Sequence, residues 1–113
     1  MRDLSTVKLC AVALSGLLVF HQSASAEPRQ VNVSMVDMTF TPARVEISAG
    51  DSVTWTNEDD RDHSVVSADG SFKSGNIGAG KQFSHTFNKV GTVAYGCAYH
   101  PRMRGTIIVS AKR

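Results

Sequence analysis

The sequence has few of the features that stabilise small exported domains or mark nucleic-acid binders. It contains only two cysteines among 113 residues, so at most one internal disulfide is possible. The 12 basic and 10 acidic residues nearly balance, for a net charge of +2. Because a nucleic-acid-binding domain usually carries a strongly basic surface, this balance argues against that class of partner.

Long apolar runs are also missing. The run LCAVALSGLLVF, residues 9–20, has 12 residues, short of the roughly 20 that a membrane-spanning helix needs. Arg2 and Lys8 precede it and the small residues SASA follow it, the pattern of a cleavable signal peptide. We therefore expect residues 1–26 to be a signal peptide, cleaved after Ala26, and the protein to be exported, to a bacterial periplasm, without stable membrane insertion.

Cleavage would leave one small domain, residues 27–113. Removing 26 of the 113 residues leaves 87, and removing Arg2, Lys8 and Asp3 leaves 10 basic and 9 acidic residues. Cys97 becomes the single cysteine, so no internal disulfide can form. An unpaired thiol in an oxidising compartment either has a chemical role or lies buried as a small apolar group.

The pattern of residues 27–113 is that of strands. QVNVSMV, SVTWTN and KQFSHTF alternate apolar and polar residues, and HSVVS, GTVAYGC and GTIIVS are short apolar runs. Turn residues recur every 8 to 12 positions, and no segment shows a helical period. Seven or eight short strands in so small a domain indicate an all-β fold, a small β-sandwich or barrel.

A group of soft metal donors stands just before the last predicted strand. YGCAYHPRMRG, residues 95–105, spaces Cys97, His100 and Met103 evenly. Thiolate and thioether are soft ligands, and imidazole suits both copper and zinc. Pro101 favours an extended backbone at His100. We expect the three side chains to share one loop between two strands, held at both ends by a sheet.

A strong site needs a fourth ligand from elsewhere in the chain. His21 belongs to the signal segment, which leaves His63 and His85. His63 opens a short apolar strand after a charged loop, a place typical of a ligand at the end of a sheet. His85 lies between Phe83 and Phe87 at the same strand parity, so we expect a core histidine with one hydrogen-bond partner. The favoured metal ligands are His63, Cys97, His100 and Met103.

This donor set is typical of a type 1 blue copper site, with two histidines, one cysteine and a weak axial methionine. Zinc is an alternative, although it prefers another cysteine, histidine or carboxylate to a methionine. Thiol catalysis is another, but it would leave Met103 without a role and would need an orienting group and an oxyanion hole.

The chain resembles the cupredoxins over residues ~30–110. FTPARVEISAGDSVTWTN and FNKVGTVAYGCAYHPRMRGTIIV are similar to two patterns of that family, and the short ligand loop is most similar to the amicyanin type. The resemblance implies a Greek-key β-sandwich that holds one copper ion through His63, Cys97, His100 and Met103. It also implies a non-enzymatic carrier of single electrons between a redox donor and acceptor of the dehydrogenase or cytochrome class, with His100 as the electron port.

Some residues differ from the family pattern. Asp62 and Ser64 flank His63 where proline and asparagine are frequent, so a bracing side-chain amide is replaced by a shorter hydroxyl. Tyr99 and Arg102 make the surroundings of His100 more polar than an apolar docking patch. Glu58, Asp59, Asp60 and Asp62 are expected to be solvated loop charges, with partner steering as the alternative.

Two other functions stay open at the level of the sequence. A copper storage or delivery protein would need an exposed site, rich in methionine or histidine, that exchanges its metal. Outside the signal segment the methionines are only Met35, Met38 and Met103. A metal-free binding module would leave the donor loop unexplained. A monomer is the default expectation.

Overall fold

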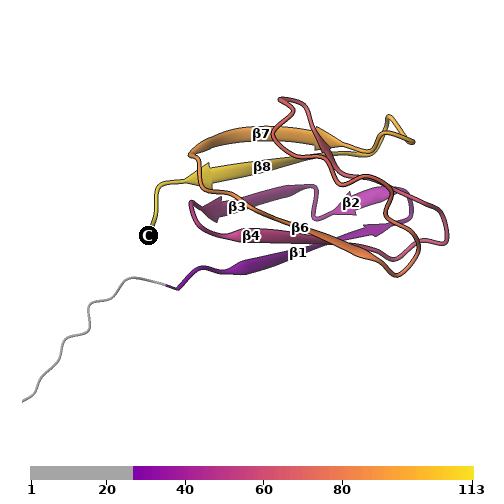
Figure 1. Ribbon diagram of the computed structural model, residues 1–113, viewed down its shortest axis with the longest axis horizontal. Coiled ribbons are helices and arrows are strands. Elements are labelled where there is room, and N and C mark those ends of the chain that lie inside the picture. Colours follow the sequence, from indigo (N-terminus) through magenta and orange to yellow (C-terminus); the bar gives the residue numbers. More distant parts are fainter. Residues whose placement is uncertain (1–26) are drawn as a thin grey trace, which may run out of the picture.

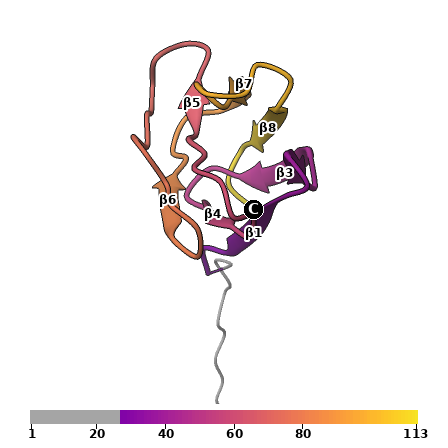
Figure 2. The same cartoon turned by 90° about the vertical axis from the view of Figure 1, so that its right-hand side faces the viewer.

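The computed structural model describes residues 27–113 as a sandwich of two four-stranded sheets (Figures 1 and 2). One sheet has the order β2-β1-β4-β6 and the other β3-β8-β7-β5. The strands are β1 Gln30–Val36, β2 Thr39–Thr41, β3 Arg44–Ser48, β4 Ser52–Asn57, β5 Val66–Ser67, β6 Gln82–Thr86, β7 Gly91–Gly96 and β8 Arg104–Ser110. The predicted all-β sandwich of seven or eight strands is confirmed.

Each sheet mixes parallel and antiparallel pairs. β1 runs parallel to β4, and β3 runs parallel to β8, while the remaining pairs are antiparallel. β7 and β8 are neighbours from Gly91↔Val109 to Gly96↔Arg104. The segment between them, residues 97–103, is therefore a loop closed by a sheet at both of its ends, as the sequence predicts.

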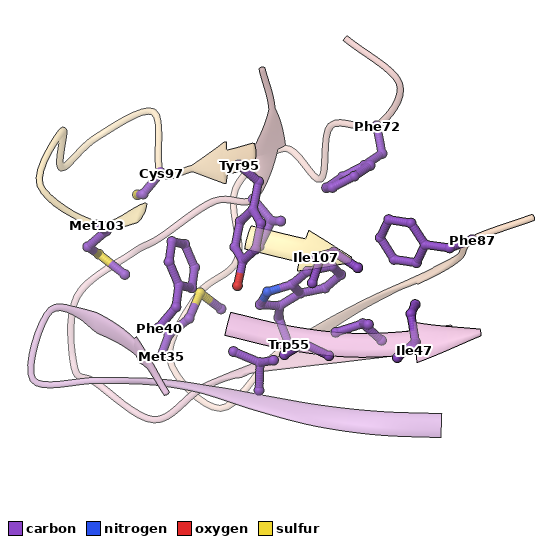
Figure 3. Packing of buried hydrophobic residues seen from close by; sticks show 14 of the residues in the cluster. Met35, Phe40, Ile47, Trp55, Phe72, Phe87, Tyr95, Cys97, Met103 and Ile107 are labelled. Atoms are coloured by element: carbon purple, nitrogen blue, oxygen red, sulfur yellow. The ribbon is translucent and has the colours of Figure 1, made fainter. Parts of the chain in front are cut away.

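Alternating residues of both sheets fill the space between the layers. Val33 and Met35 of β1 and Val53 and Trp55 of β4 have no exposed surface, and neither has Ile107 of β8. Trp55 contacts Phe72, Phe83 and Tyr95, with ring centroids 5.8, 5.8 and 5.3 Å away. Figure 3 shows this aromatic cluster continuing toward the end of the sandwich that carries Cys97 and Met103. The core therefore extends directly into the candidate site.

Tyr95 packs closely against a glycine of the neighbouring strand. It lies opposite Gly105 in the β7–β8 ladder, and a Cβ atom at Gly105 would come 2.3 Å from Cζ of Tyr95. The Tyr95 hydroxyl lies near the indole nitrogen of Trp55 (Figure 3), yet neither polar atom has a partner of good hydrogen-bond geometry within the described part of the chain, residues 27–113. Burial raises the pKa of Tyr95 to about 12, so this phenol stays neutral in the core.

One buried carboxylate connects the segment before β1 with the segment after β8. Asp51, 2% exposed, accepts hydrogen bonds from the guanidinium of Arg113 and from the backbone N–H groups of Arg29 and Ser48. The bonds from Arg113, then those from the two backbone groups, hold the pKa of Asp51 far below its ordinary value of 3.8 despite burial. This cluster lies at the β3–β4 turn.

The strand predictions differ from the structure in two places. Only Val66–Ser67 of the HSVVS run forms a strand, while His63 makes an isolated bridge with Ile77 and the backbone of Val65 bonds to Ser74. The short strand β2 was not foreseen. Residues 27–113 form no helix, and thus none that could cross a membrane. The predicted signal peptide, residues 1–26, lies outside the described residues.

Candidate metal centre

The loop between β7 and β8 is closed by its own backbone. The N–H of Met103 donates to the carbonyl of His100 at 2.9 Å, and the N–H of Cys97 donates to the carbonyl of Met103 at 3.3 Å. Gly96 gives this carbonyl room, because a Cβ there would lie 3.1 Å from the Met103 oxygen. The even spacing of the three donors thus corresponds to a tight turn that returns the chain into β8.

Three donor atoms from two distant parts of the chain converge at this loop. Nδ1 of His63 lies 3.2 Å from Nδ1 of His100, and Sγ of Cys97 lies 3.6 Å from the same His100 nitrogen. All three donor atoms lie within 4.8 Å of one another. A metal held at about 2.0–2.1 Å by imidazole and about 2.3 Å by thiolate requires donors roughly 3–4 Å apart. The two separations from the His100 nitrogen, 3.2 and 3.6 Å, fit such an ion.

The donors are shielded from water to different degrees. His63 is fully buried and Cys97 is 7% exposed, whereas His100 is half-buried. Met103 is 1% exposed, and Figure 3 shows its side chain and that of Cys97 at the same end of the core. Of the four predicted ligands, the structure brings His63, Cys97 and His100 into one cluster and buries Met103 on the loop beside them.

His63 is fixed by its backbone and by a carboxylate. Its N–H donates to the carbonyl of Ile77 at 3.0 Å, and the N–H of Ile77 donates back at 2.7 Å. On the ring, Nε2 lies 2.8 Å from Oδ2 of Asp59. An ionised carboxylate accepts hydrogen bonds only, so Nε2 carries a proton, and Nδ1 faces His100.

The loop before His63 is shaped by the buried side chain of Asn57. Its Nδ2 donates to the carbonyl of Arg61 at 2.7 Å and to that of Ile77 at 2.9 Å. Its Oδ1 accepts the N–H of Asp59 at 2.9 Å. Asn57 therefore holds Asp59 beside the Nε2 atom of His63.

Asp59 is more than a solvated loop charge. Burial raises its pKa, but hydrogen bonds from His63 and from the backbone N–H groups of Met38 and Asp37 outweigh burial and bring the pKa below its ordinary value. Glu58 likewise has a specific partner, the hydroxyl of Ser34 at 2.8 Å. For Asp59 the expectation of a solvated charge is wrong, because backbone donors of the β1–β2 turn and the ring of His63 face its carboxylate. Glu58 is exposed, and so is its hydrogen bond with Ser34.

Ser64 braces the ligand loop in spite of its short side chain. Its Oγ accepts the N–H of Ala98 at 2.8 Å and lies 3.8 Å from Sγ of Cys97. Its backbone N–H points to the same sulfur at 3.4 Å. The short hydroxyl reaches the loop because the segment between His63 and β5 runs directly against the start of the loop.

His100 lies between two hollows at the surface. One is polar and is lined by Asp60, Arg61, Asp62, Asn76, Tyr99 and His100. The other is more apolar and is lined by Met38, Thr39, Tyr99, His100, Pro101, Arg102 and Met103. Tyr99, 49% exposed, lines both hollows together with His100, so the imidazole is reachable from outside.

His85 takes no part in the donor cluster, as predicted from the sequence. Its ring centroid lies 4.6 Å from that of Phe72 and 4.8 Å from that of Phe87. Burial lowers the pKa of His85. The expected hydrogen-bond partner is not found among residues 27–113, where the contacts of the ring are with the aromatic rings of Phe72 and Phe87.

Sequence reasoning did not foresee the roles of Asn57 and Asp59. Asn57 ends a strand and Asp59 stands four residues before His63 in an acidic run. The separation of four residues between Asp59 and His63 was a possible signal. It could not be distinguished from the separations of the other acidic residues in the same run.

The comparisons with known proteins agree with the fold and the cluster. A family model described as a cupredoxin-like domain matches residues 8–109. The chain is 32% identical to amicyanin-alpha of Methylorubrum extorquens, over 94% of this chain and 92% of that protein. It is 30% identical to the amicyanin of Paracoccus denitrificans, over 68% of this chain and 63% of that protein.

Solved structures show the same likeness. A methionine-to-alanine mutant of amicyanin in its Cu(I) form superposes with a TM-score of 0.68 at 27% identity, covering 71% of this chain and 81% of that one. A purple cupredoxin from Nitrosopumilus maritimus gives a TM-score of 0.65 at 29% identity, covering 71% and 99%.

Proposed function

The chain belongs to the cupredoxin-like family, and from this premise we propose that it is a soluble, exported type 1 copper protein that carries single electrons between redox partners. The observation that carries the proposal is the convergence of one thiol and two imidazole nitrogens within 4.8 Å. Cys97 and His100 come from a loop closed by a sheet, and His63 comes from the segment before β5. Two similar proteins are amicyanins, and one similar structure is described as a Cu(I) form.

The proposed ligands are His63, Cys97, His100 and Met103. Two imidazoles and one thiolate offer a trigonal donor set, and a thioether adds a weak axial donor. A bound copper ion would supply the one-electron couple. The chain supplies rigidity, because hydrogen bonds fix His63 and the loop backbone closes on itself. Such a site is suited to changing charge without rearranging its ligands.

The path for the electron would run through His100. Its ring is half-buried and borders both surface hollows, whereas His63 is fully buried. A donor or acceptor protein, of the dehydrogenase or cytochrome class, would therefore dock over Tyr99 and His100. The role is not enzymatic, since no substrate bond is made or broken in this transfer.

The test is the visible spectrum of residues 27–113 after addition of one equivalent of Cu(II). We expect an intense thiolate-to-copper charge-transfer band that Cys97→Ser abolishes and that His85→Gln, a histidine change outside the cluster, leaves in place. A pale spectrum from the unmodified protein would overturn the proposed site.

A second measurement distinguishes a carrier from a copper storage or delivery protein. We expect fast electron self-exchange and slow transfer of copper to a chelator, since the donors are largely buried. Rapid loss of copper with slow self-exchange would favour delivery. Export is checked by the mass of the protein recovered from the periplasm, which should begin at Glu27.

A further inference from the structure

Strand β6 forms an edge of the sheet β2-β1-β4-β6 and is paired only with β4 (Figure 2). The N–H of Phe87, directly after β6, donates to the carbonyl of Asp51 at 2.9 Å. Because alternate residues of an antiparallel strand bond to its neighbour, the odd-numbered residues of β6 face β4. The backbone groups that point off the edge are those of Gln82, Ser84 and Thr86. Among residues 27–113 no other segment bonds to these backbone groups.

The other edge strands are protected in ways that β6 is not. β2 has three residues and is followed by Pro42, and β5 has two residues. β3 carries Arg44 and Glu46, both charged and exposed. β6 has five residues, and none of them is a proline, a lysine, an arginine or an acid. Natural proteins usually shorten or charge an edge strand, because an unprotected edge pairs with another chain.

The outer face of β6 carries neutral polar side chains. The hydroxyl of Ser84 lies 2.6 Å from that of Thr54, and the hydroxyl of Thr86 lies 2.7 Å from that of Ser52. These bonds hold the side chains of β6 in a fixed row along β4. Since the row contains no charge, a further strand could lie beside it without burying an ion.

The inner face of β6 carries two half-buried rings. The ring centroid of Phe83 lies 5.8 Å from that of Trp55, and the centroid of His85 lies 4.6 Å from that of Phe72. Phe83 and His85 both remain partly exposed. A strand added to this edge would remove more of their surface from water, which favours the pairing.

The sequence of β6, QFSHT, fits a second copy of itself. In an antiparallel pair centred on Ser84, Gln82 lies opposite Thr86 of the second copy, and Phe83 lies opposite His85. The outward N–H and carbonyl groups of each copy then face those of the other in hydrogen-bonding positions. The opposed aromatic rings form a favourable cross-strand pair. Lys81, the nearest cation, would lie opposite an apolar residue, so no like charges meet.

We propose that β6 is a self-association surface, through which two copies of this chain pair antiparallel with Ser84 on the two-fold axis. The interface is a single pair of strands, and complexes that bury less than roughly 1,200 Å² are weak and transient. The monomer therefore prevails at low concentration. Lys81 accepts the N–H of Asn57, whose side chain shapes the loop before His63. The axis turns one copy end for end, so the two metal centres lie at opposite ends and each His100 stays accessible.

The first test is sedimentation velocity of the processed protein from micromolar to millimolar concentration. We expect the average mass to rise from monomer toward dimer, with or without copper, because no proposed ligand takes part. Over the same range, hydrogen exchange should slow at the amides of Gln82, Ser84 and Thr86. A monomer at every concentration would overturn the proposal, and so would a dimer in which these amides exchange at an unchanged rate. Either result leaves the proposed function untouched.

The second test exploits the position of Ser84 on the axis. Ser84→Lys and Ser84→Glu each place like charges directly opposite one another, so each variant alone should remain a monomer. A mixture of the two should associate again, because opposite charges then meet. Association of either variant alone, or a mixture of folded variants that stays monomeric, would overturn the proposal.

Two controls separate this effect from damage to the fold. Ser84→Ala loses the same hydroxyl without adding a charge, and Ser110→Lys adds a charge at an exposed serine of β8. Both should associate like the unmodified protein. If a charged Ser84 variant does not fold, the hydrogen exchange of the unmodified protein still decides whether β6 is the surface.

Discussion

At the scale of single residues, the site depends on groups that do not bind the metal. Ser64 shows this best, because its hydroxyl bridges the segment between His63 and β5 and the start of the ligand loop. It accepts the N–H of Ala98 and lies within reach of the Cys97 sulfur. A donor to that sulfur withdraws electron density from the thiolate, and hydrogen bonding around this sulfur is one of the ways a protein adjusts the potential of such a site.

Ser64→Ala should therefore lower the midpoint potential, because the sulfur keeps only the backbone N–H as a donor. The free energy of unfolding should fall by about 1 kcal/mol, since the N–H of Ala98 loses its partner. The matched control is Ser67→Ala. Ser67 is also buried, and its hydroxyl bonds to Phe72 instead of the loop. Its removal should cost stability and leave the potential unchanged; a potential that shifts equally in both variants would contradict this role for Ser64.

At the scale of elements, the close packing of strands β7 and β8 against each other determines where the ligand loop between them lies. Tyr95 lies across Gly105, and a Cβ atom there would come within 2.6 Å of three atoms of the tyrosine ring. Tyr95 cannot move aside freely, because it also packs on Phe40 and Trp55 at centroid distances of 4.7 and 5.3 Å. Packing therefore requires glycine at this position, near the start of β8, directly after the ligand loop.

Gly105→Ala should destabilise the protein by about 1–3 kcal/mol, as expected for overpacking of a filled core. We also expect a broader charge-transfer band, since displaced strands would loosen residues 97–103. Urea unfolding and the visible spectrum check the two effects. Gly78→Ala is the control, because its nearest neighbours lie at ordinary contact distance, 3.7 and 3.9 Å. If Gly105→Ala unfolds like that control, the packing argument is wrong.

A strand could be predicted from the sequence where a local pattern of apolar and polar residues is sufficient to define it. Strands β1, β4 and β6 show a period of two, and the loop donors were read from their spacing alone. β5 could not be bounded, because its two residues are defined by pairing with β7. The role of Asp59 depends on the β1–β2 turn, 22 residues away, and no local pattern encodes a contact of that kind.

At the scale of the whole molecule, Asp51 unites three segments that are distant in sequence. The guanidinium of Arg113 donates to Asp51 and to the carbonyl of Glu27, while Arg29 donates its N–H to the same carboxylate. The segments that precede β1 and follow β8 are thus held at the β3–β4 turn. This cluster involves none of the proposed ligands, so it affects the stability of the sandwich separately from the metal.

The pH dependence of unfolding should reveal this cluster. The pKa of Asp51 in the folded protein lies below its ordinary value of 3.8, first because of Arg113. A carboxyl whose pKa is depressed on folding adds stability that is complete above the unfolded pKa and is lost as pH falls through the folded pKa. Arg113→Gln should therefore lower the urea midpoint of the metal-free protein at pH 7, and the difference from the unmodified protein should shrink below about pH 4.

Arg44→Gln is the matched control for this prediction. Arg44 pairs with Glu46 at 3.0 Å, but both side chains are 66% exposed, and water screens such a pair. This variant should unfold within about 0.5 kcal/mol of the unmodified protein at every pH. An Arg113→Gln difference that persists unchanged at pH 3 would show that Arg113 stabilises the fold by packing on its neighbours, because Asp51 would by then lose much of its charge in the variant. A difference that shrinks with acid would assign the effect to the buried carboxylate.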